Sequence, residues 1–247
     1  MQKKIEKIER FLQKESKKRG FENVVFGLSG GIDSAVVGYV CNEVFKKNAR
    51  AFIMPSSTSN PQNTKDAIAF AKEIGLCYEV IEIARFQDTF IDTAQLGGDS
   101  NAFHRIGNFT ARIRMAILYD KSFLHHALVV GTSNKSELML GYGTLYGDMA
   151  CAINPIGDIY KSEIFVLARE MKIPSYITSK APSADLFPGQ SDEGDLGYSY
   201  KEIDRLLMAI ERGLGKKRLL KGALIGHLWN LSKLGLKTID LRPRCPK

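Results

Sequence analysis

The sequence predicts an α/β fold in which helices cover both faces of a parallel sheet, the doubly wound arrangement. Short apolar runs typical of buried strands alternate along the chain with longer runs of helical period. A glycine pair also separates the first apolar run from the helical pattern that follows it. With 247 residues, 44% of them hydrophobic and 25% charged, the chain has the length and composition of one such domain. We therefore expect a single domain over residues 1–247, with a basic tail at 213–247 that is assigned to no element.

Each predicted element follows from a local pattern, in chain order. An amphipathic helical pattern opens the chain at residues 1–9. Four strands are predicted at residues 24–28, 51–54, 78–83 and 128–131, and the last of these is a short continuous apolar run, which is typical of a buried parallel strand. Helical periodicity predicts the elements between and after them: residues 33–45, 66–74, 108–124, 162–171 and 200–211. Gly75 closes the second of these helices because glycine readily takes the left-handed conformation at a helix end.

Composition narrows the class of protein. No apolar run approaches the length of a membrane span, and the N-terminal pattern lacks the apolar core of a signal peptide, so we expect a cytoplasmic protein with no membrane partner. A net charge of +8 suits a phosphate-rich partner but does not separate nucleotides from nucleic acid. The cysteines form no C-x-x-C pair, which favours reduced thiols in apolar surroundings: Cys41, Cys77, Cys151 and Cys245.

The most informative motif follows the first predicted strand and reads Ser29-Gly30-Gly31-Ile32-Asp33-Ser34. A strand that turns through two glycines into a helix N-terminus offers backbone N–H groups and a positive helix dipole to an oxyanion. The spacing differs from the Walker A loop, which has a longer Gly-to-Gly interval followed by Gly-Lys-Ser/Thr. The motif instead resembles the PP-loop of ATP pyrophosphatases, which split ATP into AMP and pyrophosphate. The alternative is a plain Gly-Gly turn between buried elements.

A second motif, Gly131-Thr132-Ser133-Asn134-Lys135-Ser136-Glu137, stands where the fourth predicted strand ends. Thr132 and Asn134 are suited to cap the next helix, and Glu137 follows about one turn later. In one interpretation Glu137 only complements the helix dipole. In the other, Asp33 and Glu137 share a Mg²⁺ ion, since a carboxylate inside a phosphate loop repels its ligand unless a cation lies between them.

Several further segments, in this order, make the resemblance specific to the ammonia-dependent NAD⁺ synthetases. The similarity runs from about Gly27 to about Tyr200. Besides the two motifs above it is carried by residues 107–115, 141–148, 154–156, 160–163, 181–186, 190–193 and 196–197. The family implies a Rossmann-like fold of the adenine nucleotide alpha hydrolase type. It also implies a ligase reaction, the last step of NAD biosynthesis: nicotinic acid adenine dinucleotide, ATP and ammonia give NAD⁺, AMP and pyrophosphate through an acyl-adenylate.

The resemblance also implies a role for individual residues. It makes Asp33 and Glu137 the Mg²⁺ ligands and catalytic residues together with Lys161, and it places Arg112 on the dinucleotide. The residues implied to contact ATP are Gly27, Leu28, Ser29, Gly30, Gly31, Ile32, Asp33, Ser34, Thr132, Lys161 and Ser183. Simpler interpretations remain open: a surface arginine for Arg112, a solvated helix-start lysine for Lys161 and a turn serine for Ser183.

The chain departs from the family at two positions. Many members have a lysine where Leu145 stands and an aspartate where Ala152 stands, and both contact the substrate, so part of that recognition must be rebuilt or absent here. Two other functions stay open: another PP-loop ligase or tRNA-modifying enzyme, and a binding-only nucleotide or nucleic-acid module. Neither is favoured, because no paired cysteines are visible and a binding-only site leaves Asp33, Glu137 and Lys161 without a role; no nucleic-acid partner is expected.

Two expectations concern assembly and the nitrogen source. The family implies a homodimer, and the helix over residues 108–124 has an apolar surface broader than one sheet face requires, through Phe109, Ile113, Ala116, Ile117 and Leu118. The alternative is that this helix is buried within one subunit. Free ammonia is the expected nitrogen source, because no cysteine of the chain suits a glutaminase nucleophile. A separate glutaminase subunit remains possible.

Overall fold

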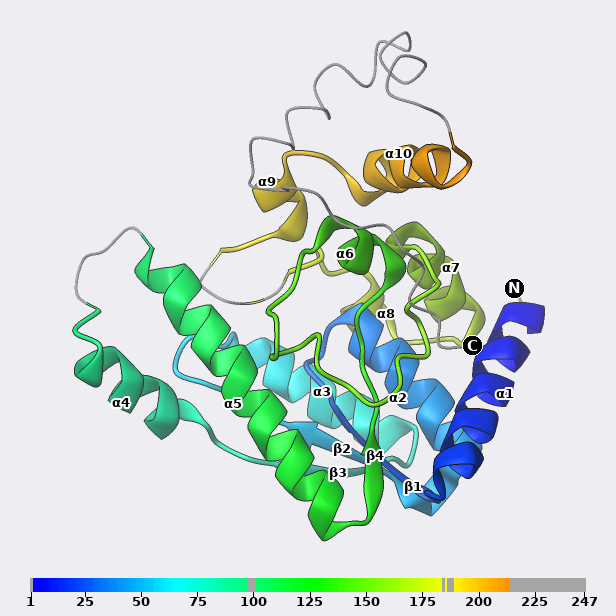
Figure 1. Ribbon diagram of the computed structural model, residues 1–247, viewed down its shortest axis with the longest axis horizontal. Coiled ribbons are helices and arrows are strands. Elements are labelled where there is room, and N and C mark those ends of the chain that lie inside the picture. Colours follow the sequence, from blue (N-terminus) through cyan, green and yellow to red (C-terminus); the bar gives the residue numbers. More distant parts are fainter. Residues whose placement is uncertain (1, 97–100, 184, 186–188, 214–247) are drawn as a thin grey trace, which may run out of the picture.

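A computed structural model describes residues 2–96, 101–183, 185 and 189–213 of the chain. Four parallel strands form one sheet in the order β3-β2-β1-β4 (Figure 1): β1 (Asn23–Gly27), β2 (Ala49–Ile53), β3 (Cys77–Val80) and β4 (Ala127–Val129). The central strand β1 pairs Val24 with Ala49 on one side and with Leu128 on the other. The order changes direction at β1, so the carboxyl end of β1 is the switch point where ligands bind in such folds.

Helices cover both faces of the sheet, which confirms the doubly wound fold. On one face, alternate strand residues such as Val24 and Phe26 pack against a set of five helices: α1 (Gln2–Arg19), α2 (Ile32–Phe45), α3 (Pro61–Glu73), α7 (Lys161–Glu170) and α8 (Ser175–Thr178). On the other face, Val25 and Phe52 pack against α5 (Ala102–Leu124). A short 3₁₀ turn, η1 (Lys46–Asn48), joins α2 to β2.

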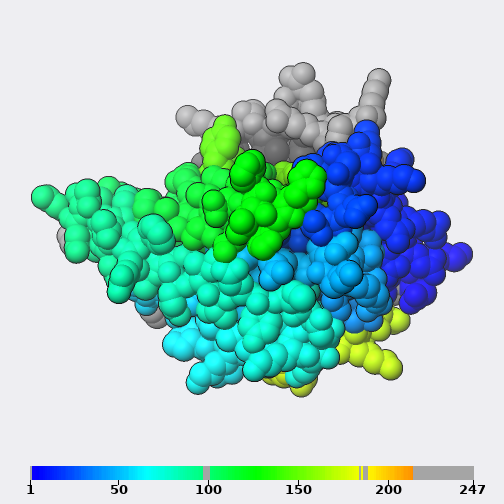
Figure 2. Space-filling model, turned by 90° about the horizontal axis from the view of Figure 1, so that it is seen from below, coloured from blue at the N-terminus to red at the C-terminus, as the bar shows by residue number. Residues whose placement is uncertain are grey.

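A small second core lies at the end of the sheet where β4 finishes. It is formed by α6 (Lys135–Leu140), α9 (Asp192–Leu196) and α10 (Tyr200–Glu211), which gather there together with the start of α7 (Figure 1). Leu140, Leu196, Tyr200 and Ile203 are buried in it. On the opposite side, α4 (Ala84–Thr93) packs on α5, and the segment around α4 and the start of α5 extends from the body (Figure 2).

Several predicted boundaries were wrong, for local reasons. Helix α3 starts at Pro61 and not at residue 66, because the Asn60 side chain caps it by accepting from the backbone of Gln62. Helix α5 starts at Ala102 and not at residue 108, and α4, α8 and α9 were not predicted. Strand β3 ends at Val80, although the backbone N–H groups of residues 81 and 83 still donate to the carbonyl oxygens of residues 53 and 55, at and just beyond the end of β2.

The described cysteines differ in how far they are buried. Cys41 is buried and free, as expected, and Cys151 is half-buried. Cys77 is exposed on the edge strand, so the expectation of apolar surroundings was wrong there, and Cys245 lies outside the described residues.

None of the helices in the described ranges is long and apolar enough to cross a bilayer. The basic tail also falls outside the described residues, from 214 onward.

Candidate active site

The glycine motif forms the turn between β1 and α2, at the switch point of the sheet. Gly30 takes the left-handed conformation, with φ of +81°. The turn is held internally: the backbone N–H of Ser29 donates to the Ser34 hydroxyl at 3.1 Å, and this hydroxyl donates to the Gly31 carbonyl oxygen at 2.9 Å. The N–H of Gly31 donates to the Ser29 hydroxyl at 3.2 Å. The loop thus presents backbone donors and two hydroxyls at a helix N-terminus, which is the chemistry of a phosphate site.

Asp33, Glu137 and Lys161 come together beside this loop, although Asp33 precedes Lys161 by 128 residues. The Lys161 ammonium lies 2.5 Å from a carboxylate oxygen of Asp33 and 3.5 Å from one of Glu137. Its side chain is only 3% exposed. The interpretation of Lys161 as a solvated lysine is therefore wrong, and the structure groups the three residues that the sequence predicted as catalytic.

The electrostatics of this cluster are set by burial and by the two carboxylates. Burial, and next the charge of Asp33, raise the pKa of Glu137 to about 8. Burial by itself lowers the pKa of Lys161, but the Asp33 and Glu137 charges outweigh it and hold the pKa above its usual range. When both carboxylates are ionised, they leave a net negative charge beside the one ammonium. Mg²⁺ commonly binds through one or two carboxylates plus substrate phosphates, so this donor set fits a magnesium ion. No cluster of three His, Cys, Asp or Glu residues that could hold a metal occurs in the described part of the chain.

Asn134 fixes both carboxylates. Its side-chain oxygen accepts from the backbone of Glu137 at 3.0 Å, while the Glu137 side chain accepts from the backbone of Asn134 at 3.1 Å, a reciprocal cap at the start of α6. The Asn134 amide also donates to Asp33 at 3.0 Å. The sequence indicated Asn134 as a cap, but not its contact with Asp33, which joins segments that only the folded sheet brings together.

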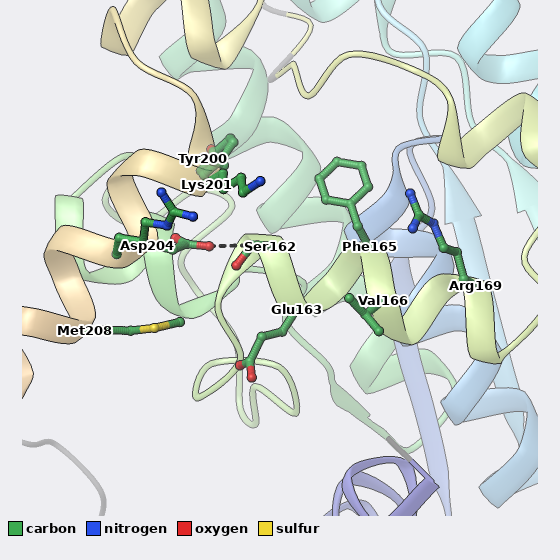
Figure 3. A pocket seen from close by; sticks show the side chains of 10 residues that line it. Ser162, Glu163, Phe165, Val166, Arg169, Tyr200, Lys201, Asp204 and Met208 are labelled. Atoms are coloured by element: carbon green, nitrogen blue, oxygen red, sulfur yellow. Dashed lines mark hydrogen bonds between the residues drawn. The ribbon is translucent and has the colours of Figure 1, made fainter.

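Asp204 on α10 anchors the helices that carry Lys161 and Glu137. Its carboxylate, 1% exposed, accepts from the backbone N–H of Ser162 at 2.7 Å and from the hydroxyl of Ser136. Ser136 in turn accepts from the backbone N–H of Lys161 at 2.9 Å. Figure 3 shows Asp204 directed at Ser162. The helix dipole favours a carboxylate at the first turn of α7. Asp204 therefore fixes the position of this turn, from which the Lys161 side chain extends to the carboxylate cluster.

The groove drawn in Figure 3 lies between α7 and α10 and has a volume of about 650 Å³. Phe165, Val166 and Met208 form its apolar wall, and Arg169, Lys201 and Arg205 also line it. Asp33, Glu137 and Lys161 are not among its lining residues. The groove is therefore separate from the carboxylate cluster.

Asp192 is an acidic residue buried next to the cluster, in addition to Asp33 and Glu137, and it was not assigned a role from the sequence. Its carboxylate is held by the phenol groups of Tyr142 at 3.3 Å and Tyr200 at 3.0 Å. Burial raises the pKa of Asp192, and the nearby charge of Lys161 acts in the opposite direction. The Lys161 ammonium also lies 5.2 Å from the centre of the Tyr200 ring. The signal was present in the motif of residues 190–193, which the resemblance included without giving it a role.

The remaining predicted residues lie around this centre without joining it. Thr132 follows β4 and makes no hydrogen bond to the described residues. Ser183 is exposed and accepts from the backbone of Asp185 at 3.0 Å, as a turn serine does. Arg112 is exposed on α5, and its Nε donates to the carbonyl oxygen of Leu145 at 3.2 Å. Their assignments to ATP and to the dinucleotide stay predictions.

The two positions that depart from the resemblance differ in setting. Leu145 is 65% exposed in the loop after α6, next to Arg112. Ala152 donates its backbone N–H to Val129 at 2.9 Å, so it lies beside the end of β4. The two departures therefore affect different regions of the molecule, one on the surface and one at the sheet.

Known proteins resemble this chain over most of its length. The family model described as NAD synthase matches residues 4–227. An NH₃-dependent NAD⁺ synthetase of Helicobacter pylori is 55% identical over 201 residues, which cover 81% of this chain and 76% of that protein. The solved structure of the NH₃-dependent NAD synthetase of Campylobacter jejuni, in complex with the nitrate ion, superposes with a TM-score of 0.77 at 41% identity, covering 94% of this chain and 93% of that one. An NMN synthetase structure from Francisella tularensis gives a TM-score of 0.82 at 30% identity and covers 98% of each chain.

Proposed function

Because this chain belongs to the NAD synthase family, we propose that it uses ATP and ammonia to amidate nicotinic acid adenine dinucleotide, giving NAD⁺, AMP and pyrophosphate. The observation that carries the proposal is the contact of one buried lysine with two carboxylates beside a glycine loop, at the switch point of the sheet. Such a site has phosphate donors, a cation and metal-type ligands in one place. It has the parts needed to transfer an adenylyl group to a carboxylate.

Each part has a physical task in this proposal. The backbone N–H groups and hydroxyls of the loop hold the ATP phosphates. Lys161 stabilises the negative charge that grows as pyrophosphate leaves. Asp33 and Glu137 would hold Mg²⁺, which would offset the negative charge of the ATP phosphates. Thr132 and Ser183 donate hydroxyl hydrogens to ATP, and Arg112 binds the dinucleotide.

The chemistry proceeds in two steps. The nicotinate carboxylate attacks the α-phosphorus of ATP, forming an acyl-adenylate and releasing pyrophosphate. Ammonia then attacks the activated carbonyl carbon, the amide forms, and AMP leaves. No protein nucleophile is required, so catalysis rests on positioning and on electrostatic stabilisation.

A product assay tests this function. The purified protein is incubated with the dinucleotide, an ammonium salt, ATP and Mg²⁺, and we expect NAD⁺, AMP and pyrophosphate in equal amounts. ADP and orthophosphate would contradict the proposal. The fit to the NMN synthetase structure makes the mononucleotide the second candidate substrate, so nicotinic acid mononucleotide is assayed in parallel. We expect the larger kcat/KM with the dinucleotide, since the 55% identical relative is an NAD⁺ synthetase.

The nitrogen source gives a separate prediction. We expect turnover with ammonium salts at a rate that rises with pH, because deprotonation of ammonium supplies the nucleophile NH₃. Glutamine freed of ammonia should support no comparable rate, since burial raises the pKa of the Cys41 and Cys151 thiols and so disfavours the nucleophilic thiolate. The measurement is the initial rate of NAD⁺ formation at fixed total ammonium across a pH series. Equal rates with glutamine alone would show that the nitrogen chemistry is different.

A homodimer in which α5 forms the interface is part of the proposal. Three of the predicted apolar residues, Ile113, Ile117 and Leu118, pack against the sheet within the subunit. Helix α5 nevertheless leaves a second stripe outward at helical spacing: Arg112, Ala116, Tyr119 and Phe123. Phe123 is 91% exposed, and the neighbouring Leu124 is 65% exposed. This stripe ends at Arg112, which is proposed to bind the dinucleotide, so it suits a subunit contact beside the substrate site.

Charging this stripe tests the assembly. Light scattering at micromolar concentration should report a dimer for the wild type and a monomer for Phe123→Lys, because an unpaired ammonium is costly inside an apolar interface. The matched control is Phe86→Lys on α4, where the phenylalanine is 52% exposed and away from the stripe. A wild-type monomer that retains full activity would contradict the proposal.

A further inference from the structure

Lys180, a residue to which the function proposed above gives no role, contacts the glycine loop. It follows α8 and precedes Ser183 by three residues. Its ammonium donates to the carbonyl oxygen of Gly30 at 3.1 Å and to the side-chain oxygen of Asn63, on α3, at 2.8 Å. It also forms an ion pair of 2.5 Å with Asp66, one turn further along α3. One side chain therefore joins the glycine loop to α3.

These contacts occupy the whole donor capacity of Lys180. An ammonium has three N–H groups, and three acceptors surround it. Asp66 is 8% exposed and cancels the charge of Lys180 at close range. Lys180 thus has no donor left for a phosphate and adds little net positive potential to the loop, so its role there is geometric.

The geometry concerns the peptide bond between Gly30 and Gly31. A trans peptide is planar, and its carbonyl and N–H groups point in opposite directions. When Lys180 holds the Gly30 carbonyl outward, the Gly31 N–H points to the other side, where it now meets the Ser29 hydroxyl at 3.2 Å. Gly30, at φ of +81°, has no side chain to restrict rotation of this peptide.

The surrounding contacts hold Lys180 in place. Asp185 accepts from the Asn63 side chain at 3.0 Å and from the Asn60 backbone at 3.1 Å, so Asp185 holds the start of α3 at two points. The backbone oxygen of Asn63 in turn lies against Gly30: a Cβ added to Gly30 would be 2.3 Å from it. The loop is fixed from outside as well as from within.

We propose that Lys180 is a positioning residue of the phosphate loop, which holds the Gly30–Gly31 peptide so that the Gly31 N–H faces the phosphates of ATP. This inference rests on the proposed function, in which that loop binds the ATP phosphates. Lys180 acts through the loop and does not touch the reacting atoms.

The test compares Lys180→Met with Lys65→Met, a control on the exposed side of the same α3. Lys180→Met should raise the KM for ATP and weaken the binding of magnesium pyrophosphate, measured by calorimetry, by about tenfold, the equivalent of one hydrogen bond to a charged group. The KM values for the dinucleotide and for ammonium should stay unchanged, and Lys65→Met should behave as the wild type.

A second variant separates orientation from simple stability. Asp66→Asn removes the counter-charge but keeps the ammonium beside Gly30, so it should lower the melting temperature without raising the KM for ATP. If Lys180→Met leaves pyrophosphate affinity intact, or if both variants raise the KM for ATP in proportion to their loss of stability, the inference is wrong. If the wild type itself binds neither ATP nor pyrophosphate, the proposed function fails, and the inference with it.

Discussion

Replacing Lys161 by methionine is expected to reduce kcat by about a thousandfold, the scale of removing a group that stabilises charge in a phosphoryl-transfer transition state. Methionine keeps most of the length and the apolar stem of lysine but has no charge. The Lys161 side chain is only 3% exposed, so we expect no water molecule to take the place of the lost ammonium. The measurement is kcat for NAD⁺ formation at saturating ATP, dinucleotide and ammonium.

The same substitution has a second expected result, which does not depend on turnover. Removing the ammonium takes away the ion-pair partner of Asp33 in a partly buried site, so stability in metal-free buffer should fall, as it does when one partner of a buried ion pair is removed. Added Mg²⁺ should then raise the melting temperature of Lys161→Met more than that of the wild type, because the ion binds the folded form and replaces the missing charge.

Lys201→Met on the exposed face of α10 is the matched control, with unchanged kcat and melting temperature. Two outcomes would count against the role given to Lys161. One is a kcat that falls less than tenfold, and the other is a Mg²⁺ response equal to that of the wild type.

Gly30→Ala should abolish measurable activity and lower the free energy of unfolding by about 2 kcal/mol or more. Two costs add: a non-glycine residue in the left-handed region costs roughly 1–2 kcal/mol, and the new Cβ would lie 2.3 Å from the Asn63 backbone oxygen. Since backbone atoms cannot turn aside as a flexible side chain can, either the loop or the start of α3 must move. Both movements displace the N–H groups proposed to hold the phosphates.

The chain offers a control that isolates the contact from the strain. Gly75, after α3, also has a positive φ, of +67°, but an added Cβ meets nothing within 4 Å there. Gly75→Ala should therefore show only the strain, with kcat unchanged. Chemical denaturation of both variants and of the wild type gives the comparison. Equal destabilisation by the two substitutions, with activity retained in Gly30→Ala, would refute the close approach of Asn63.

Local patterns predicted the sheet, most helices and the motifs at the strand ends. The strand runs and the glycine turn depend on neighbouring residues, so a sequence window contains the needed information. Glu137 and Asp33 were predictable for the same reason, since each stands within a motif that follows a buried strand. Tertiary contacts were harder to predict. The starts of α3 and α5 were missed because Asn60 as a cap and the packing of α4 on α5 override weak periodicity.

The supporting residues of the site could not be predicted, because their roles depend on long-range contacts. Asp204 looks like an ordinary helix residue in the sequence, yet it accepts hydrogen bonds from Ser136 and Ser162, 68 and 42 residues away. Lys180 resembles a loop lysine, but its partner Gly30 is 150 residues earlier. No window of sequence contains both members of such a pair.

The wide spacing of these contacts has a consequence for how the protein is made. The site joins Asp33 to Lys161 across 128 residues, and the central strand β1 pairs with β4, about a hundred residues later. Closing long loops is slow, because their entropy is lost before the distant contacts form. During synthesis the glycine loop therefore emerges early but cannot gain Lys161, Lys180 or the buried Asp192 until most of the chain has left the ribosome. Nucleotide-binding capacity is thus a late event in folding, and it reports that nearly the whole domain has formed.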